Sequence, residues 1–346
     1  MLVAPLNWGL GHATRCIPII NALIKAKYEP ILASDGGALL LLQKEFPSLK
    51  SYVLPSYNIK YSNKGKNLLI KLFLSIPSVI SAVKKERKTV NLLIETEGIT
   101  GIISDNRFGV VSYKIPSVYI THQLRVLSGL TTFFTSKIHQ KIIEQFNECW
   151  IPDIENKFNF SGDLGHIDNQ NINIKYVGLL SRFKKENLAI KYDLLVLLSG
   201  PEPQRTLLEV KLLLELKSYK GNILFVRGTL LNLAKITKPA NFKVINYLLS
   251  EELEEVINQS KVILARSGYS TIMDLAVLGK KAFFIPTPGQ FEQEYLANIL
   301  NQKLIAPFVT QEEFTIEHLK RLDEFSGFQL QKITFKLDFF KLFEGK

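Results

Sequence analysis

Residues suited to acid–base chemistry gather near the amino terminus, in the stretch NWGLGHATRC at residues 7–16. Gly9 and Gly11 follow an apolar run and permit a tight turn, and His12 and Arg15 come directly after them. A turn between a strand and a helix leaves backbone N–H groups that can hold an anion. Histidine accepts a proton close to neutrality, since its unperturbed pKa is about 6.5. The stretch therefore predicts a site where a side chain works beside a phosphate or a sugar. We expect Gly9 and Gly11 to let the backbone approach the phosphates of a donor, and Arg15 to bind that donor by steadying its charge.

Two more residues are candidates for the base that such chemistry needs. Asp105 in ISDNRF and His122 in YITHQL each follow an apolar run that predicts a strand. Loops at the carboxyl ends of parallel strands hold the ligands of open α/β sheets. His12 is the first choice, Asp105 and His122 are the alternatives, and a structural histidine bonded to the backbone explains His122 equally well. Arg107 is placed to pair with Asp105 or to contact an acceptor.

A second stretch, residues 265–300, carries the features of a site for a diphosphate and a sugar. A turn of small residues opens a predicted helix there, and the unpaired N–H groups of such a helix start suit a diphosphate. Asp274, one turn further on, could accept hydrogen bonds from ribose hydroxyls, or could simply favour the helix start. Glu292 and Gln293 begin the next predicted helix and are placed to bond a sugar. The turn and helix start comprise Ser267, Gly268, Tyr269, Ser270 and Thr271.

Two arginines follow predicted strands in the same half of the chain. Arg266 comes directly after the run 262–265, where it is either a phosphate ligand or half of a buried salt bridge. Arg227 in LFVRGTL ends the run 222–226, and we expect it to line a cleft between domains.

Short apolar runs alternate with helical patterns along the whole chain, and these elements must position the candidate residues. Runs that are apolar throughout and are separated by helices are typical of parallel strands covered on both faces. The rhythm occurs twice, so the sequence predicts an α/β protein with two Rossmann-like doubly wound domains and a cleft between them. The predicted strands are 2–6, 29–33, 50–54, 101–104, 117–121, 148–151, 194–198, 222–226, 242–245, 262–265 and 282–285.

The break between the two series falls in a polar, asparagine-rich stretch. We expect an acceptor-binding domain at 1–165, a linker at 166–191 and a donor-binding domain at 192–330. The last residues, 331–346, are amphipathic and predict a helix that could pack back on the first domain.

Composition limits the class of protein. The chain has 346 residues, of which 46% are hydrophobic and 22% charged, as in globular proteins with a sizeable core. It lacks an uncharged apolar run long enough to cross a membrane and a secretory signal, so we expect a cytoplasmic protein. Cys16 and Cys149 cannot form a disulfide scaffold, and the five scattered histidines form no metal-binding pair.

The chain has a net charge of +11, and +7 of it lies in the segment 60–88, which holds eight basic residues and one acidic residue around an apolar stretch. Basic residues beside an apolar helix favour an anionic membrane surface, and a buried helix with a solvated basic edge is the alternative. Nucleic acid would more often require basic residues interleaved with aromatic residues and glycines, and is not expected as a partner.

A nicotinamide dinucleotide site is a competing interpretation of the first turn, because Asp35 ends the second predicted strand. That fingerprint needs a third glycine, and Thr14 stands in its place while His12 projects into the loop.

The segment 262–300 resembles the donor domain of GT-B glycosyltransferases, and the GLGH turn at residues 9–12 resembles the glycine-rich first loop of one branch of them. That branch contains the N-acetylglucosaminyltransferase that forms lipid II and monogalactosyldiacylglycerol synthase. The resemblance implies an inverting enzyme without a bound metal, a nucleotide diphosphate-sugar donor that is most often UDP-linked, and a lipid-linked or glycolipid acceptor at the cytoplasmic membrane face. No cofactor is expected.

Carried to single positions, the resemblance implies that Gly268 to Thr271 hold the diphosphate and Asp274 the ribose. Glu292 and Gln293 would then read the sugar. Tyr247 and Leu248 in INYLLSEEL would flank the uracil, and Ser199 and Gly200 in LLVLLSG would form the first loop of the donor domain. The continuation SGPEPQ has fewer glycines than that family loop.

Two other functions share this architecture. One is a non-catalytic subunit that binds a nucleotide sugar, and the other is a UDP-sugar 2-epimerase. Such an epimerase would be expected to bring several acidic residues and a histidine into the cleft.

Overall fold

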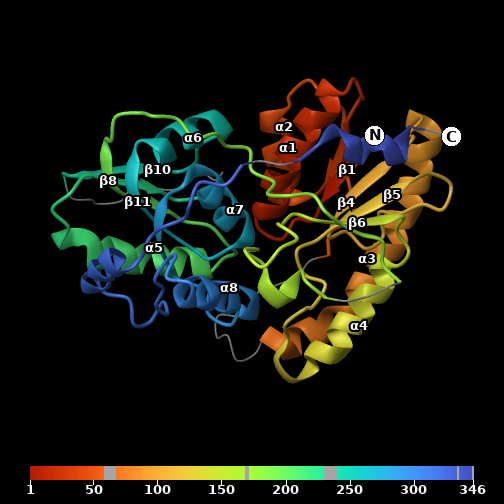
Figure 1. The fold of residues 1–346 in the computed structure, drawn as a ribbon. Coiled ribbons are helices and arrows are strands. Elements are labelled where there is room, and N and C mark those ends of the chain that lie inside the picture. Colours follow the sequence, from red (N-terminus) through yellow and green to blue (C-terminus); the bar gives the residue numbers. More distant parts are fainter. Residues whose placement is uncertain (58–67, 168–170, 230–239, 333–334, 345–346) are drawn as a thin grey trace. The chain divides into compact units, whose positions relative to one another are not determined.

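The computed structural model of the protein describes residues 1–57, 68–167, 171–229, 240–332 and 335–344, with only the backbone of residues 68–76. The chain forms two compact units, drawn in Figure 1. Unit 1 contains the described residues of Met1–Lys60, Asn67–Ser181 and Ile333–Lys346, and unit 2 contains those of Arg182–Lys332.

Unit 1 is built on a parallel sheet of seven strands in the order β3-β2-β1-β4-β5-β6-β7. In the register of β1 and β4, Pro5 lies opposite Asp105, so both strands end at the same level. Buried Val, Ile, Leu and Ala fill the central strands, as is typical of a parallel sheet covered on both faces. The strands are β1 (Leu2–Pro5), β2 (Ile31–Ser34), β3 (Ser51–Val53), β4 (Ile102–Asp105), β5 (Ser117–Ile120), β6 (Glu148–Ile151) and β7 (Ile174–Tyr176).

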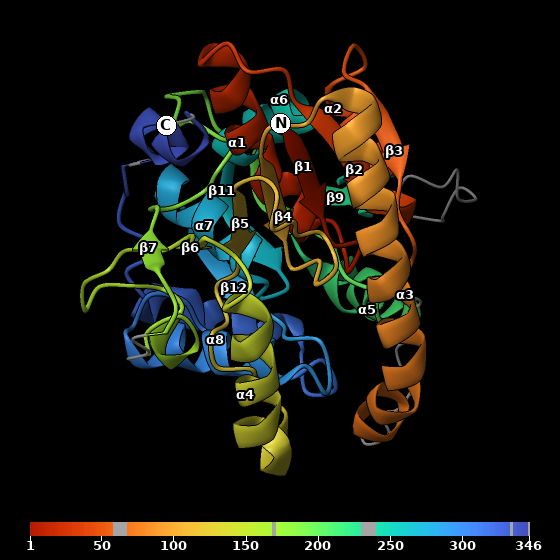
Figure 2. The ribbon, with the colours of Figure 1, turned by 90° about the vertical axis from the view of Figure 1, so that its right-hand side faces the viewer.

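Among the described residues of unit 1, four α-helices cover this sheet: α1 (Gly11–Lys25), α2 (Gly36–Glu45), α3 (Leu68–Glu97) and α4 (Thr132–Ile143). Val90 and Leu93 of α3 pack on strand residues of β1, β2 and β4, and Ile143 of α4 packs on β5 and β6. In Figure 2, α3 and α4 both extend beyond the strands that they cover. Two 3₁₀ helices, η2 (Gly129–Thr131) and η3 (Gly162–Leu164), lie in the connections.

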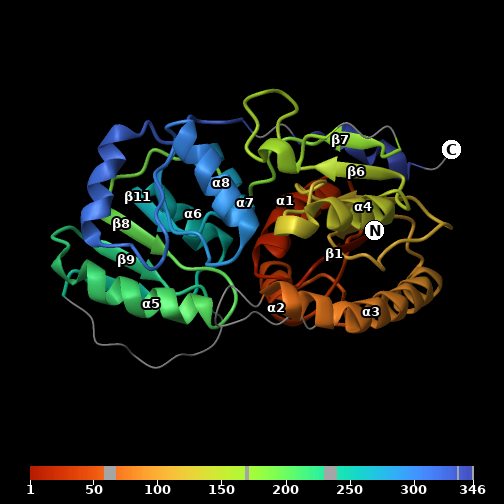
Figure 3. The same cartoon turned by 90° about the horizontal axis from the view of Figure 1, so that it is seen from below.

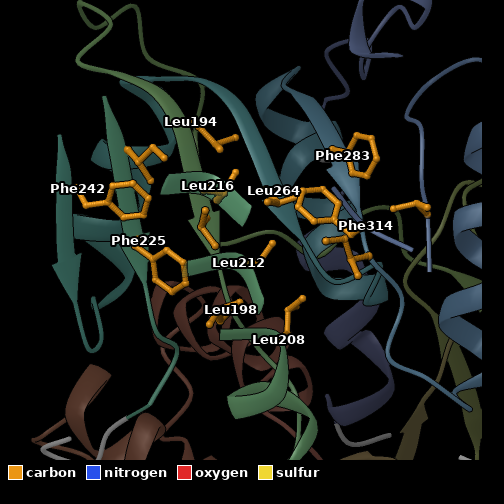
Figure 4. Packing of buried hydrophobic residues seen from close by; sticks show 14 residues of the cluster. Leu194, Leu198, Leu208, Leu212, Leu216, Phe225, Phe242, Leu264, Phe283 and Phe314 are labelled. Atoms are coloured by element: carbon orange, nitrogen blue, oxygen red, sulfur yellow. The ribbon is translucent and has the colours of Figure 1, made fainter. Parts of the chain in front are cut away.

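Unit 2 is built on a parallel sheet of five strands in the order β10-β9-β8-β11-β12. Its helix α5 lies on one side of the sheet, and α6 and α7 lie on the other (Figure 3). The core under α5 joins Leu208 and Leu212 to strand residues and to Phe314 (Figure 4). The elements are β8 (Tyr192–Leu197), α5 (Gln204–Glu215), η4 (Leu216–Ser218), β9 (Ile223–Val226), β10 (Phe242–Ile245), α6 (Ser250–Asn258), β11 (Ser260–Ala265), α7 (Tyr269–Leu278), β12 (Lys281–Phe284), α8 (Phe291–Gln302) and η5 (Ile316–Glu324).

The stretch of chain that was expected to be a linker, residues 166–191, is partly an ordered piece of unit 1. Residues 166–191 contain β7, which adds an edge strand to the first sheet, and unit 1 continues to Ser181. The carboxyl-terminal segment belongs to unit 1, where Phe339, Phe340 and Phe343 surround the buried ring of Trp150. Its regular part is the 3₁₀ helix η6 (Leu337–Phe343) rather than an α-helix.

Both sheets are doubly wound, which confirms the predicted fold class. In unit 1 the strand order reverses between β1 and β4, and in unit 2 it reverses between β8 and β11. Ligands of open α/β sheets bind beyond the carboxyl ends of the strands at such a reversal. The loops after β1, β4, β8 and β11 therefore lie where such a sheet binds its ligands.

Candidate active site

The glycine turn after β1 brings His12 to the start of a helix. Gly9 has a φ of 75°, a left-handed conformation that glycine adopts without steric cost. The helix α1 begins at Gly11. The Thr14 hydroxyl donates to the Gly11 carbonyl at 3.0 Å within this first turn. His12 therefore lies in the first turn of α1.

His12 and Arg15 both contact the carboxylate that ends β4. The His12 Nδ1 atom lies 2.7 Å from Asp105 Oδ1. The Arg15 guanidinium donates to both Asp105 oxygens through Nε and Nη2, and Nη2 also lies 2.8 Å from His12 Nδ1. Arg15 is buried, so its contacts with Asp105 are those of an interior ion pair rather than a ligand site. This corrects the expectation that Arg15 binds the donor.

The third candidate base joins the same cluster. His122 follows β5 and is buried, and its Nδ1 atom lies 3.0 Å from Arg15 Nη1. Sequence reasoning missed Cys16, whose Sγ atom lies 3.7 Å from Asp105 Oδ2. Its spacing of four residues from His12 is the signal that could have found it, because such residues share one helix face.

The charges in this cluster assign the roles. Burial alone would raise the pKa of Asp105, but Arg15 and His12 lower it to about 2, so the carboxylate is ionised and cannot act as a base near neutrality. An ionised carboxylate only accepts hydrogen bonds, so the contact with Asp105 requires a proton on Nδ1 of His12 and leaves the lone pair on Nε2. Arg15 Nη2 only donates, so in this tautomer its 2.8 Å approach to Nδ1 is not a hydrogen bond. Burial lowers the pKa of His12, Asp105 opposes this shift, and Arg15 adds to it. His12 is thus neutral near pH 7.

Arg107 does not pair with Asp105 as one alternative proposed. Its guanidinium lies 2.7 Å from Asp35 and 2.7 Å from Glu86 of α3. The Tyr57 hydroxyl donates to Glu86 at 2.7 Å in the same buried group. Arg107 therefore ties α3 to the ends of β2 and β4, and Asp35 is engaged in this ion pair rather than in nucleotide binding.

The reversal in unit 2 is lined by small residues. Ser199 and Gly200 follow β8 and are partly exposed, and Gly200 has a φ of 103°. Gly228 follows β9 with a φ of 67°, and a Cβ atom there would lie 2.0 Å from the Leu198 carbonyl oxygen. Gly228 thus serves the close approach of two loops.

Gly268 serves no such packing. It precedes α7 with a φ of −70°, and a Cβ atom built on it would meet nothing within 4 Å. The fold alone therefore does not require glycine at this position. Ser270, Thr271 and Asp274 follow in the first turns of α7 and are partly exposed, whereas Tyr269 is buried. An anion could approach the backbone N–H groups at this helix start.

Arg266 faces the protein interior, although it ends β11 beside this turn. It is 1% exposed, and its guanidinium donates to the carbonyl oxygens of Gln204, Ile285 and Pro286 and to Gln311. Burial lowers the pKa of Arg266 to about 9. Neither a phosphate contact nor a buried salt bridge describes it, so the structure corrects both expectations.

Arg227 is also turned to the interior, as a buried partner of Glu209 on α5 at 2.8 Å. Glu209 is shared with Arg205, which lies 2.7 Å away. Arg227 therefore fastens α5 to the end of β9, which differs from the expected place along a cleft.

The loop after β12 is closed by its own hydrogen bonds. The Gln293 side-chain oxygen accepts from the Thr287 N–H at 2.8 Å, and the Ser267 hydroxyl donates to the Gln293 carbonyl at 2.8 Å. Gln293 and Ser267 are buried, so they position this loop and the turn after β11. Glu292, which is partly exposed in the first turn of α8, remains the better placed of the predicted sugar readers.

Tyr247 and Leu248, which are predicted to flank the uracil, precede α6. Tyr247 is partly exposed and Leu248 is buried. Both follow β10, which is one edge strand of the sheet, as β12 is the other.

The predicted membrane segment, residues 60–88, lies partly outside the described residues, which include neither Lys60, Lys64 and Lys66 nor the side chain of Lys71. In its described part, Lys84, Lys85 and Lys88 of α3 are exposed. None of the described helices is long and apolar enough to cross a membrane. Among the described residues, no three His, Cys, Asp or Glu side chains gather as a metal site would require.

The sequence of the chain is similar to that of known glycosyltransferases. Residues 204–324 match the glycosyltransferase family 28 C-terminal domain. The UDP-N-acetylglucosamine--N-acetylmuramyl-(pentapeptide) pyrophosphoryl-undecaprenol N-acetylglucosamine transferase of Haemophilus ducreyi is 25% identical over 291 residues, which cover 78% of this chain and 77% of that enzyme.

Solved structures extend the likeness to the whole chain. The spinosyn rhamnosyltransferase SpnG has a TM-score of 0.64 with 13% identity, covering 99% of both chains. The Streptomyces sp. SF2575 glycosyltransferase SsfS6, complexed with thymidine diphosphate, has a TM-score of 0.57 with 13% identity, covering 89% of this chain and 86% of that one. The protein is a glycosyltransferase of the GT-B fold that resembles the lipid II-forming N-acetylglucosaminyltransferases.

Proposed function

We propose that the protein is an inverting, metal-independent glycosyltransferase that moves a sugar from a UDP-sugar to a hydroxyl of a lipid-linked or glycolipid acceptor. The observation that carries the proposal is the neutral His12 held by ionised Asp105 at the strand reversal of unit 1. A histidine in this state is ready to accept a proton through Nε2.

In the proposed reaction the acceptor oxygen forms a bond to the anomeric carbon from the face opposite the leaving group. The bond between that carbon and the phosphate oxygen breaks, and the diphosphate leaves with the electron pair. His12 Nε2 takes the hydroxyl proton, and the resulting imidazolium is stabilised by Asp105. Arg15 fixes the carboxylate and is a positioning residue.

The donor side of the proposal rests on the start of α7. Backbone N–H groups from Gly268 to Thr271 carry partial positive charge, which stabilises a diphosphate as negative charge develops on it. This arrangement supplies the stabilisation that a metal ion provides in other transferases, which is why we propose a metal-independent reaction. The names of the compared proteins include UDP-N-acetylglucosamine and thymidine diphosphate, in agreement with a nucleoside diphosphate donor.

The acceptor side of the proposal rests on the name of a relative and on the exposed lysines of α3. The name of the Haemophilus ducreyi enzyme includes a pyrophosphoryl-undecaprenol substrate. The exposed Lys84, Lys85 and Lys88 of α3 suit anionic lipid headgroups. Both observations support a lipid-linked acceptor and a peripheral location at the cytoplasmic membrane face.

Calorimetric titration of the purified full chain with UDP, GDP, TDP and NAD tests the donor assignment. We expect saturable UDP binding that is unchanged by a chelator and is weakened by Asp274→Ala. Preference for NAD, or no UDP binding, would contradict the proposal. Transfer from a UDP-sugar panel to a polyprenyl diphosphate-linked acceptor in the presence of EDTA then separates an enzyme from a non-catalytic subunit, which would bind UDP without turnover.

A further inference from the structure

Asn106 has a rare backbone conformation beside the cluster around His12. Its φ is 56°, in the left-handed region that residues other than glycine seldom adopt. Among the described residues, the other two non-glycine residues with a positive φ are Lys27 and Leu304. They stand two residues after the ends of α1 and α8, where chains commonly take this conformation as they leave a helix. Asn106 instead follows β4, directly after Asp105, so no helix end accounts for its conformation.

The turn at Asn106 lies between two side chains with different partners. Asp105, before the turn, contacts His12 on α1 at 2.7 Å. Arg107, after the turn, contacts Glu86 on α3 at 2.7 Å. Strained backbone conformations persist where the surrounding structure fixes them, and they cluster at active sites. A change of φ at Asn106 would move the backbone on both sides of it, and the Asp105 carboxylate would move with it.

The side chain of Asn106 is held by a buried hydroxyl group. The Tyr119 hydroxyl donates to Asn106 Oδ1 at 2.9 Å, and His139 Nε2 lies 3.0 Å from the same hydroxyl oxygen. Tyr119 is buried in β5, where it lies opposite Ser104 of β4. A phenol has one proton, so with that proton given to Asn106 the hydroxyl accepts from the N–H of His139 Nε2. This chain of hydrogen bonds fixes the position of the Asn106 amide.

We propose that Asn106 is a positioning residue for the pair formed by Asp105 and His12. Its left-handed backbone and its hydrogen bond to Tyr119 hold the end of β4 so that the Asp105 carboxylate meets Nδ1 of His12. That contact selects the tautomer in which Nε2 can accept a proton. The inference rests on the proposed function for the role of His12 as the base, but the tautomer of His12 is observable without donor or acceptor.

Nitrogen-15 NMR of the full chain labelled at histidine tests the positioning directly. Long-range nitrogen–proton spectra near neutral pH show which ring nitrogen carries the proton, and His12→Gln assigns the His12 signals among the five histidines. We expect the wild type to hold the proton on Nδ1, and Asn106→Ala to populate both tautomers. The matched control is Asn147→Ala, which removes an amide of unit 1 that accepts the Ser117 N–H at 2.8 Å and should leave the His12 signals unchanged.

Steady-state rates with a UDP-sugar and the polyprenyl diphosphate-linked acceptor test what this positioning contributes to turnover. We expect Asn106→Ala to lower turnover about tenfold to hundredfold with the donor KM unchanged, because a small displacement of catalytic groups has effects of this size. Asn106→Gly keeps access to the left-handed conformation and should lower turnover about threefold. Tyr119→Phe removes the same hydrogen bond as Asn106→Gly, so the double variant should be within about twofold of the slower single variant.

Unfolding experiments separate positioning from a merely structural role. Thermal unfolding gives the folded fraction of each variant, and the dispersed signals of the spectra report on the folded molecules. A structural role would lower the folded fraction of Asn106→Ala and leave the proton on Nδ1 of His12 in the molecules that remain folded, which would overturn the proposal. Equal spectra and equal turnover for Asn106→Ala and Asn147→Ala would overturn it as well.

Asn106→Gly and Tyr119→Phe keep the test valid if Asn106→Ala does not fold. We expect both tautomers of His12 in each of these variants, and the wild-type tautomer in both would overturn the proposal. Failure of the proposed function looks different, because Asn106→Ala would then shift the tautomer while the wild type transfers no sugar. Conversely, sugar transfer by the wild type with an unchanged tautomer in every variant overturns only the positioning.

Discussion

The two units carry different kinds of residue at the point where their strand order reverses. In unit 1 the reversal between β1 and β4 is filled by ionisable side chains, with His12 and Arg15 on Asp105. In unit 2 the reversal between β8 and β11 is lined by small residues such as Gly200 and Gly268, while Arg227 and Arg266 turn inward. Under the proposed function, the same topology serves proton transfer in one unit and holds an anion on backbone groups in the other.

This difference shows that a charged residue at a strand end does not by itself mark a ligand site. Arg15 and Arg266 both follow the reversal of their sheet, and both are buried. Arg15 orients a carboxylate that holds the proposed base, whereas Arg266 binds backbone carbonyls. What each arginine does is decided by its partner.

The largest predicted effect is on turnover, and it follows from replacing the Asp105 carboxylate of unit 1. Asp105→Asn should lower turnover by about 10³–10⁴, because the amide no longer selects the tautomer with Nε2 as proton acceptor. The donor KM should change little, since we propose that unit 2 holds the nucleotide. Steady-state rates measure both values, and Asp163→Asn, on an exposed carboxylate of unit 1, is the control. A raised KM with unchanged turnover would show that Asp105 belongs to donor binding.

The second prediction separates the scaffold of unit 1 from its chemistry. Arg107→Met should lower the free energy of unfolding by about 3–5 kcal/mol, because Glu86 is left buried without its partner. Glu86→Gln in the same chain should restore part of this loss. Urea denaturation measures the effect, and Lys114→Met, from an exposed pair with Glu95, should cost less than about 1 kcal/mol. Equal losses for both arginine and lysine variants would contradict the buried ion pair.

The third prediction concerns acid sensitivity, which should reside in unit 1. Burial lowers the pKa of His139 to about 4. Between pH 6.5 and pH 4, His139 is therefore protonated in the unfolded chain and neutral in the folded chain. Stability should therefore fall by about 3 kcal/mol as pH drops from 6.5 to 4. Hydrogen exchange should show unit 1 opening before unit 2, and His139→Gln should flatten this dependence. An unchanged slope in that variant would place the acid sensitivity elsewhere.

The smallest predicted effect tests the backbone site of unit 2. Gly268→Ala should weaken UDP binding about tenfold by placing a methyl group in the anion's approach, with little loss of stability because that space is empty. Gly228→Ala should instead lower stability and change UDP binding little, since its Cβ would clash with the Leu198 carbonyl. Calorimetry and thermal unfolding measure the two effects. Wild-type UDP affinity in Gly268→Ala would remove the α7 start from the donor site.

Most of the fold was predictable because parallel strands buried on both faces are apolar throughout. The predicted run 148–151 coincides with β6 (Glu148–Ile151), and 242–245 with β10 (Phe242–Ile245). The strand β7 was missed because it is a three-residue edge strand with a lysine at its centre, in an asparagine-rich region. Such a strand is defined by its pairing with β6, which sequence patterns do not contain.

The members of the cluster around Asp105 other than Cys16 were named from the sequence, and their arrangement was not predictable. Sequence placed His12, Asp105 and His122 each after a strand, as rivals for one role. The structure joins them through Arg15, because the register of β1 and β4 sets Pro5 opposite Asp105. Spacing along the chain contains no information on that register.

The most direct test of the account uses His12→Ala in the presence of EDTA, with UDP binding and sugar transfer measured on the same preparation. We predict a UDP dissociation constant within about threefold of wild type and a turnover lower by about 10²–10⁴, the usual contribution of a general base. Wild-type turnover, or a loss of UDP affinity as large as the loss of rate, would contradict the assignment of proton transfer to unit 1 and donor binding to unit 2.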